Sequence, residues 1–164
     1  MSPTSSPRTA AARRRRSTVA VKESMRELRR QLSLLNHQVG VRLELKDVDL
    51  DCLALIGADG PLSPSALARR AGLHPATVTG ILDRLQRGGW IVRERDPDAA
   101  DRRAVTVRAV RDRTAEIFGL YAGMNTAMDR LCAGYSEAEL DLLAGFLRRA
   151  TEAGREATDD LAAR

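Results

Sequence analysis

Arginine and threonine side chains recur in two groups between residues 77 and 103. The first group follows His74-Pro75 and falls on one side of an expected helix, and the second, Asp101-Arg102-Arg103, ends a polar loop. Guanidinium groups bind phosphates and guanine edges through paired hydrogen bonds, and threonine contacts bases through its hydroxyl or methyl group. These residue types at this spacing indicate recognition of a polyanion. The first group consists of Thr77, Thr79, Arg84 and Arg87, with Gly80 among them.

Residues 62–88 have the pattern of two short helices joined by a tight turn. Ser63-Pro64 and His74-Pro75 each place a capping side chain before a proline at the first helical position. Gly72 ends the first helix and Gly88 ends the second, whose apolar residues recur at helical spacing. This arrangement predicts a helix-turn-helix, in which the second helix lies in the major groove of DNA and shows its polar residues, Arg84 included, to solvent. The residues expected to cap these helices or contact the DNA backbone are Ser63, Ser65 and His74.

Two strand-like segments, 90–95 and 104–108, follow the second helix and flank the polar loop 96–103. They predict a hairpin with arginines at its tip. A hairpin directly after a recognition helix is a wing, because an extended guanidinium can enter the narrow minor groove, where the potential is most negative. A plain surface hairpin with a charged tip is the alternative. The expected wing residues are Arg93, Asp101, Arg102 and Arg103.

Positive charge is concentrated in two parts of the chain, whose net charge is +5. Residues 1–22 carry six basic and no acidic residues, and residues 61–111 carry ten basic and five acidic residues. Residues 112–164 carry six basic and ten acidic residues. A polyanion that binds the basic segments would release counterions, so its affinity would fall steeply with salt. A GC-rich genome would produce the same preference for Arg over Lys.

Long apolar stripes at spacings of three and four residues occupy both terminal parts of the chain. Such stripes often pack against a partner helix. Residues 1–20 are expected to form a disordered basic arm, either a solvated tail or an additional electrostatic contact with DNA. The predicted fold is mainly α with a small β-hairpin wing: an N-terminal dimerisation helix at 21–46, a winged helix-turn-helix at 47–111 and C-terminal dimerisation helices at 112–164.

Several helix boundaries can be predicted more closely. The N-terminal helix is expected to run from about Val21 to about Gly40, and further helices are expected at 49–58 and 113–133. Ser136 and Glu139 fit a capping box, in which each side chain satisfies the other residue's free amide. The last helix is therefore predicted to begin immediately after Ser136.

Five motifs of the sequence match a known family pattern: Leu62–Ala68, Ala76–Thr79, Leu82–Leu85, Asp96-Pro97 and Asp101–Arg103. On these motifs, the chain from about Val21 to its C-terminus resembles the MarR family of bacterial transcription regulators. The resemblance implies a dimer formed by the terminal helices, with Asp101 orienting Arg103 for the minor groove and Arg102 near the backbone. It also implies a small-molecule effector near the dimer interface, for which Met124, Asn125 and Met128 are candidate pocket residues, with helical packing as the alternative. Many members have Arg where this chain has Gly80, and the wing loop is longer by Ala99-Ala100.

No metal site or cofactor is predicted, because Cys52 and Cys132 are far apart and do not cluster with His37 or His74. Both thiols are interpreted as buried core residues, with a redox role as the alternative. No apolar run follows Arg13–Arg16. Secretion and membrane insertion are therefore not expected, and the protein is expected to be cytoplasmic.

The leading hypothesis is a homodimeric, sequence-specific transcription regulator, in the simplest case a repressor relieved by a ligand. Its partners would be near-palindromic double-stranded DNA, a second copy of the chain and an effector of unknown identity. The alternative is a helical interaction or scaffold protein with a degenerate winged helix, which Gly80 motivates. Enzymatic activity is not expected, since the sequence has no Ser-His-Asp order, phosphate-binding glycine loop or carboxylate pair near a histidine.

Overall fold

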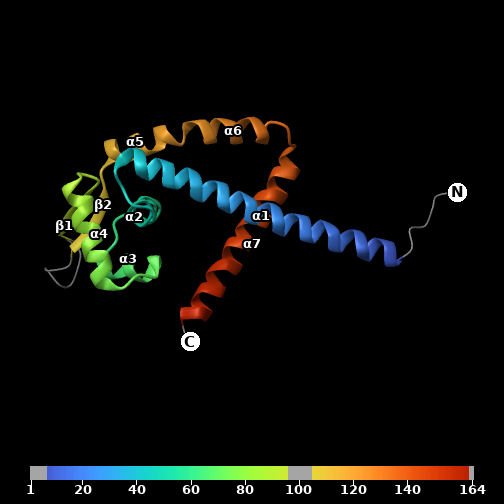
Figure 1. The fold of residues 1–164 in the computed structure, drawn as a ribbon, viewed down its shortest axis with the longest axis horizontal. Coiled ribbons are helices and arrows are strands. Elements are labelled where there is room, and N and C mark those ends of the chain that lie inside the picture. Colours follow the sequence, from blue (N-terminus) through green and yellow to red (C-terminus); the bar gives the residue numbers. More distant parts are fainter. Residues whose placement is uncertain (1–6, 96–104, 163–164) are drawn as a thin grey trace. The chain divides into compact units, whose positions relative to one another are not determined.

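The computed structural model describes residues 7–95 and 105–162 and is mainly helical, with one two-stranded hairpin in the described part (Figure 1). The chain divides after Ile117 into two compact units. None of the described helices is both long enough and apolar enough to cross a membrane. The elements are α1 (Pro7–Leu43), α2 (Asp47–Asp59), α3 (Pro64–Ala71), α4 (Pro75–Arg87), β1 (Ile91–Arg95), β2 (Val105–Ala109), α5 (Arg111–Leu120), α6 (Ala122–Cys132) and α7 (Glu137–Ala162).

The first unit has one apolar core, which α2, α3, α4 and the hairpin share. Leu67 of α3, Leu85 of α4 and Val107 of β2 are each completely buried. Removing such side chains from water is the main favourable contribution to folding, about 1.5–3 kcal/mol for each. The remaining buried members are Cys52, Leu53, Ile56, Leu62, Ala68, Val78, Ile81, Leu82, Trp90 and Ile91.

The hairpin is joined to the helices by hydrogen bonds as well as by packing. Strands β1 and β2 are antiparallel, with Arg93 opposite Val107. The amide of Leu62 donates to the carbonyl of Val107 at 3.1 Å, and the amide of Val107 donates to the carbonyl of Leu62 at 2.8 Å. The Arg113 guanidinium of α5 stacks on the Trp90 ring at 3.7 Å from its centroid. The base of the hairpin is therefore fixed to the segment before α3 and to α5.

The turn between α3 and α4 follows the predicted chemistry. Ser63 is the N-cap of α3, where its Oγ accepts from the amide of Ala66 at 3.2 Å. His74 is the N-cap of α4, where its Nδ1 accepts from the amide of Ala76 at 3.2 Å. Gly72 ends α3 with φ of 64°, a left-handed conformation that glycine adopts without steric cost. These local signals place the two helices of the helix-turn-helix.

Helix α1 begins much earlier than the sequence pattern predicts. It starts at Pro7, so residues 7–20 are helical and do not form the disordered arm expected at 1–20. Alanine and arginine have high helix propensity, and proline is favourable at the first helical position. The hydroxyls of Ser17 and Thr18 donate to the carbonyls four residues earlier. No apolar stripe precedes Val19, so apolar periodicity does not predict this extension of the helix.

The second difference concerns residues 113–133, where one continuous helix was predicted. The structure has two helices, because the chain turns at Tyr121, whose amide donates to the carbonyl of Phe118 at 3.1 Å. Gly119 and Gly123 flank this turn and lower the helix propensity on both sides. The predicted capping box of α7 is confirmed: the amide of Ser136 donates to Glu139 Oε2 at 2.8 Å, and Ser136 Oγ accepts from the amide of Glu139 at 3.4 Å.

Candidate nucleic-acid interface

Helix α4 presents a polar face opposite its buried residues. Its apolar side packs in the core, while Thr77, Thr79 and Arg87 are exposed and Gly80 is half-exposed. The hydroxyl of Thr79 donates to the carbonyl of Pro75 at 3.1 Å. Its proton is thereby occupied, which leaves an acceptor lone pair and the methyl group for contact with a base edge.

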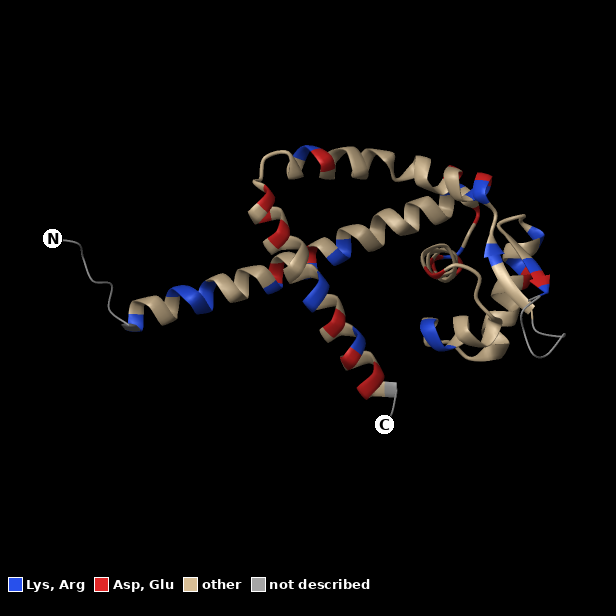
Figure 2. Ribbon diagram, turned by 180° about the vertical axis from the view of Figure 1, so that it is seen from behind, with Lys and Arg blue, Asp and Glu red and all other residues tan. Residues whose placement is uncertain are grey.

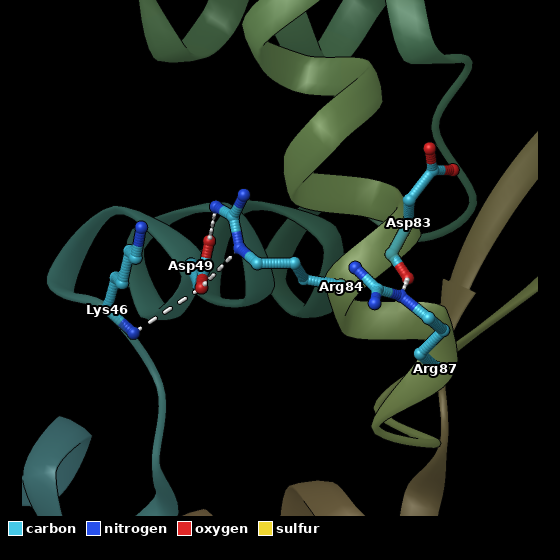
Figure 3. Close-up of polar contacts among 5 residues, drawn as sticks. All are labelled: Lys46, Asp49, Asp83, Arg84 and Arg87. Carbon is cyan, nitrogen blue, oxygen red and sulfur yellow. Dashed lines mark hydrogen bonds and ion pairs between the residues drawn. The ribbon is translucent and has the colours of Figure 1, made fainter.

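Arg84 does not face solvent in the way that the sequence analysis expected. Its side chain reaches across to α2, where Nη2 lies 2.6 Å from Asp49 Oδ1 and Nε lies 3.3 Å from Asp49 Oδ2 (Figure 3). The Asp49 side chain is 3% exposed and that of Arg84 is 35% exposed. A buried carboxylate is costly without a cation, and this cost explains why the guanidinium turns inward. The pairing also raises the pKa of Arg84, which stays charged.

Sequence reasoning missed Asp49, although its position gave a signal. Asp49 is the third residue of α2, and its Oδ2 also accepts from the amide of Lys46 at 3.4 Å. A carboxylate in the first turn of a helix satisfies free amides and the helix dipole. Nothing local indicated that its second partner would be an arginine 35 residues further along the chain.

Asp83 links helix α4 to the hairpin. Arg93 Nη2 of β1 lies 2.6 Å from Asp83 Oδ1, and Arg87 Nε donates to the Asp83 carbonyl at 3.2 Å (the latter in Figure 3). Arg93 is therefore occupied by an ion pair. A further pair crosses the hairpin, where Arg108 Nη2 lies 2.5 Å from Glu94 Oε1. Both pairs are largely exposed, and exposed pairs contribute little to the stability of a fold.

The remaining predicted site residues fall into three groups. Asp101, Arg102 and Arg103, which the sequence predicts for the wing tip, lie outside the described residues. Ser65 is exposed, and its Oγ lies 3.1 Å from that of Ser63 at the start of α3. Of the three residues proposed for an effector pocket, Met124 of α6 is half-buried, and the other two, Asn125 and Met128, are exposed.

Charge is distributed unevenly over the described chain (Figure 2). Residues 61–95 and 105–111 contain eight basic and two acidic residues, whereas α7 contains three basic and seven acidic residues. Arg69 and Arg70 on α3 are both exposed, and Arg70 forms an ion pair with Asp59. Helices α3 and α4 and the hairpin therefore carry a net positive charge, which suits a polyanionic partner. Helix α2, which shares their core, carries four acidic residues and no basic one.

A helix-turn-helix followed directly by an antiparallel hairpin defines a winged helix-turn-helix protein, and comparison with known proteins agrees. The MarR family model matches residues 45–105. YcgE of Bacillus subtilis (strain 168), an uncharacterized HTH-type transcriptional regulator, is 30% identical over 130 residues, which cover 79% of this chain and 83% of YcgE. YetL of the same strain, an HTH-type transcriptional repressor, is 29% identical over 89 residues, which cover 54% of this chain and 52% of YetL.

A solved structure has the same fold. A MarR family protein from Bacillus stearothermophilus has a TM-score of 0.66 at 17% identity, with 86% of this chain and 97% of that protein covered. The chain belongs to the MarR family of helix-turn-helix transcription regulators. It is a DNA-binding regulator with no enzymatic role, and the predicted mainly helical fold with a hairpin wing and long terminal helices is confirmed.

Proposed function

We propose that the chain acts as a homodimer that represses transcription from a near-palindromic operator and leaves it when a small-molecule effector binds. Repression is supported by the likeness to YetL, which is named a repressor. Release by an effector is what the family resemblance implies, and the effector's chemistry is not part of the proposal. Because its partner is DNA, the proposed location is the cytoplasm.

The observation that carries the dimer is an exposed apolar stripe on α1. Met25, Leu28 and Leu32 recur at spacings of three and four and are 37%, 47% and 42% exposed. Contiguous apolar surface of this kind marks an interface, because leaving it in water is unfavourable. Helix α7 has a second such group in Leu143, Phe146 and Leu147. We assign both surfaces to contact with a second copy.

In the proposed complex, two copies of α4 enter successive major grooves about 34–36 Å apart, as a two-fold dimer requires. Thr77, Thr79 and Gly80 face the bases, and Arg87 contacts the backbone. Asp101 orients Arg103 for the minor groove, with Arg102 near the phosphates, and Ser63, Ser65 and His74 lie at helix starts that can approach the backbone.

The test is selection of binding sites from a random duplex library at physiological salt, together with the mass of the free protein from light scattering. We expect enrichment of one near-palindromic sequence and the mass of a dimer. Dimers that enrich no sequence would contradict the proposal and favour the interaction or scaffold alternative. Monomers that bind a single half-site would contradict the dimer but leave specific DNA binding intact.

A further inference from the structure

Asp49 stands apart from the other buried residues. Within residues 7–95 and 105–162, Asp49 is the one polar or charged residue among the buried residues, and the others are apolar. Folding a carboxylate into such a core is unfavourable unless it is paired and hydrogen-bonded. A buried ion pair seldom increases stability over an apolar pair of equal volume. Stability alone therefore does not explain why the core of the first unit contains the Asp49 carboxylate.

The geometry of the pair is directional. Arg84 presents Nη2 and Nε to the two oxygens of Asp49, at 2.6 and 3.3 Å, and the Lys46 amide holds Oδ2 from the other side (Figure 3). A two-pronged contact between a planar guanidinium and a carboxylate fixes orientation as well as distance. The hydrophobic effect that buries the apolar side of α4 is not directional, so the ion pair adds an orientational constraint to that packing.

The two partners join the elements that matter for DNA reading. Asp49 lies in the first turn of α2, and Arg84 lies in α4, one turn after Gly80. No side chain at position 80 competes for this space, since a Cβ built there would be 3.9 Å from Arg84 Nη1. The first turn of α2 is itself held, because the Leu45 amide before it donates to the Gly40 carbonyl of α1 at 2.9 Å.

We propose that Asp49 and Arg84 are positioning residues for operator recognition, which hold α4 at the rotation that presents Thr77 and Thr79 to the bases. Arg84 itself then makes no base contact. This inference rests on the proposed function, because it requires an operator that the chain selects. It replaces the direct role that the sequence pattern suggested for Arg84 with an indirect one.

The experiment compares Asp49→Asn, Arg84→Lys and the double variant with the wild-type dimer, on the selected operator and on a scrambled duplex, over a range of salt. Lysine keeps the charge but lacks the fork, and asparagine keeps the shape but lacks the charge. Neither single change leaves a buried carboxylate without a nearby cation, so both variants should fold. Circular dichroism and thermal melts define a temperature at which every variant is fully folded.

We expect each single variant to bind the operator about tenfold more weakly, with unchanged affinity for the scrambled duplex and an unchanged salt slope. The double variant should bind the operator no more weakly than the single variant with the lower operator affinity, because both changes remove the same interaction. Arg30→Lys is the matched control. Arg30 pairs with Glu27 within α1, so this pair does not fix the orientation of one helix relative to another. The operator affinity of Arg30→Lys should therefore equal that of the wild type.

Three results would overturn the assignment. Tighter operator binding by Asp49→Asn, with a steeper salt slope, would show that the freed guanidinium of Arg84 contacts DNA. Lower melting temperatures with unchanged operator affinity in the folded variants would show a purely structural pair. A wild-type dimer that selects no operator would contradict the proposed function together with the role of the pair, whereas the first two results contradict the pair alone.

Discussion

Glycine occupies a position on the outward face of α4 where a side chain would fit. Apart from Arg84 Nη1 at 3.9 Å, nothing described lies within 4 Å of a Cβ built on Gly80. Glycine within a helix costs stability because it loses more backbone freedom on folding. Neither packing nor backbone conformation in this chain therefore requires a glycine at position 80.

Gly80→Ala should stabilise the protein by about 0.5–1 kcal/mol, because alanine has the higher helix propensity and finds free space there. Thermal unfolding should show a melting temperature about 2–4 °C higher per kcal/mol in a chain of this length. Gly40→Ala is the contrasting variant, since its Cβ would lie 2.7 Å from the Leu45 carbonyl oxygen. It should lower the melting temperature, and a decrease in both variants would contradict the argument.

The two cysteines differ in a way that the sequence pattern did not indicate. Both were interpreted as core residues, but only Cys52 is buried, and Cys132 at the end of α6 is exposed. Burial raises the pKa of the Cys52 thiol to about 11, with smaller contributions from the nearby negative charges of Asp49 and Asp51. The thiolate is the reactive form, so Cys52 should be inert at neutral pH.

In a Cys132→Ser variant, a maleimide probe at pH 7.5 should label no thiol in the native protein and one thiol per chain in denaturant. The unfolded thiol ionises near pH 9.0, whereas the folded one does so near 11. The free energy of unfolding is therefore unaffected by Cys52 below pH 9 and should fall between pH 9 and 11, where only the unfolded state loses the proton. Rapid labelling of the native variant would contradict the burial of Cys52.

At the scale of elements, local signals predicted the two helices of the helix-turn-helix and the hairpin well, whereas features that depend on non-local contacts were not predicted. The Ser63 and His74 caps, the glycine after α3 and the hairpin could be read from adjacent residues. The inward turn of Arg84 could not, because it depends on a carboxylate in another helix. The early start of α1 depends on propensity alone, which periodicity does not measure. Base contacts by the candidate residues remain predictions.

The wing makes its own prediction. Arg103→Ala should weaken operator binding at physiological salt by about tenfold or more, because a cation is lost from a narrow, strongly negative groove. The melting temperature should stay the same, since the proposed contact exists only in the complex. Arg108→Ala is a comparison within the hairpin, because Arg108 is already paired with Glu94. Equal operator affinity of wild type and Arg103→Ala would remove the argument for the wing.

At the scale of the whole molecule, the dimer is the feature most directly open to mutation. Leu28 lies on the α1 stripe and is 47% exposed, whereas Leu34 is 58% exposed and lies off that stripe. Leu28→Glu places a charge in the proposed interface, while Leu34→Glu changes a leucine that is also exposed but lies off the stripe.

Leu28→Glu should sediment as a folded monomer and bind the full operator far more weakly, since two linked half-sites become one. Its circular dichroism should match that of wild type, because Leu28 contributes nothing to the core of the first unit. Leu34→Glu should remain a dimer. A dimeric Leu28→Glu variant would show that the α1 stripe does not form the interface.

The pairing between Leu62 and Val107 has a consequence for how the protein behaves in a crowded cell. A two-stranded hairpin has two outer edges whose unpaired amides and carbonyls can recruit strands from other chains. The Leu62 bridge occupies the β2 edge at Val107. The β1 side carries Arg93, Glu94 and Arg95, three exposed charged residues in succession. The β2 edge is therefore covered at Val107 and the β1 edge carries charge, and both features disfavour the addition of a strand from another chain.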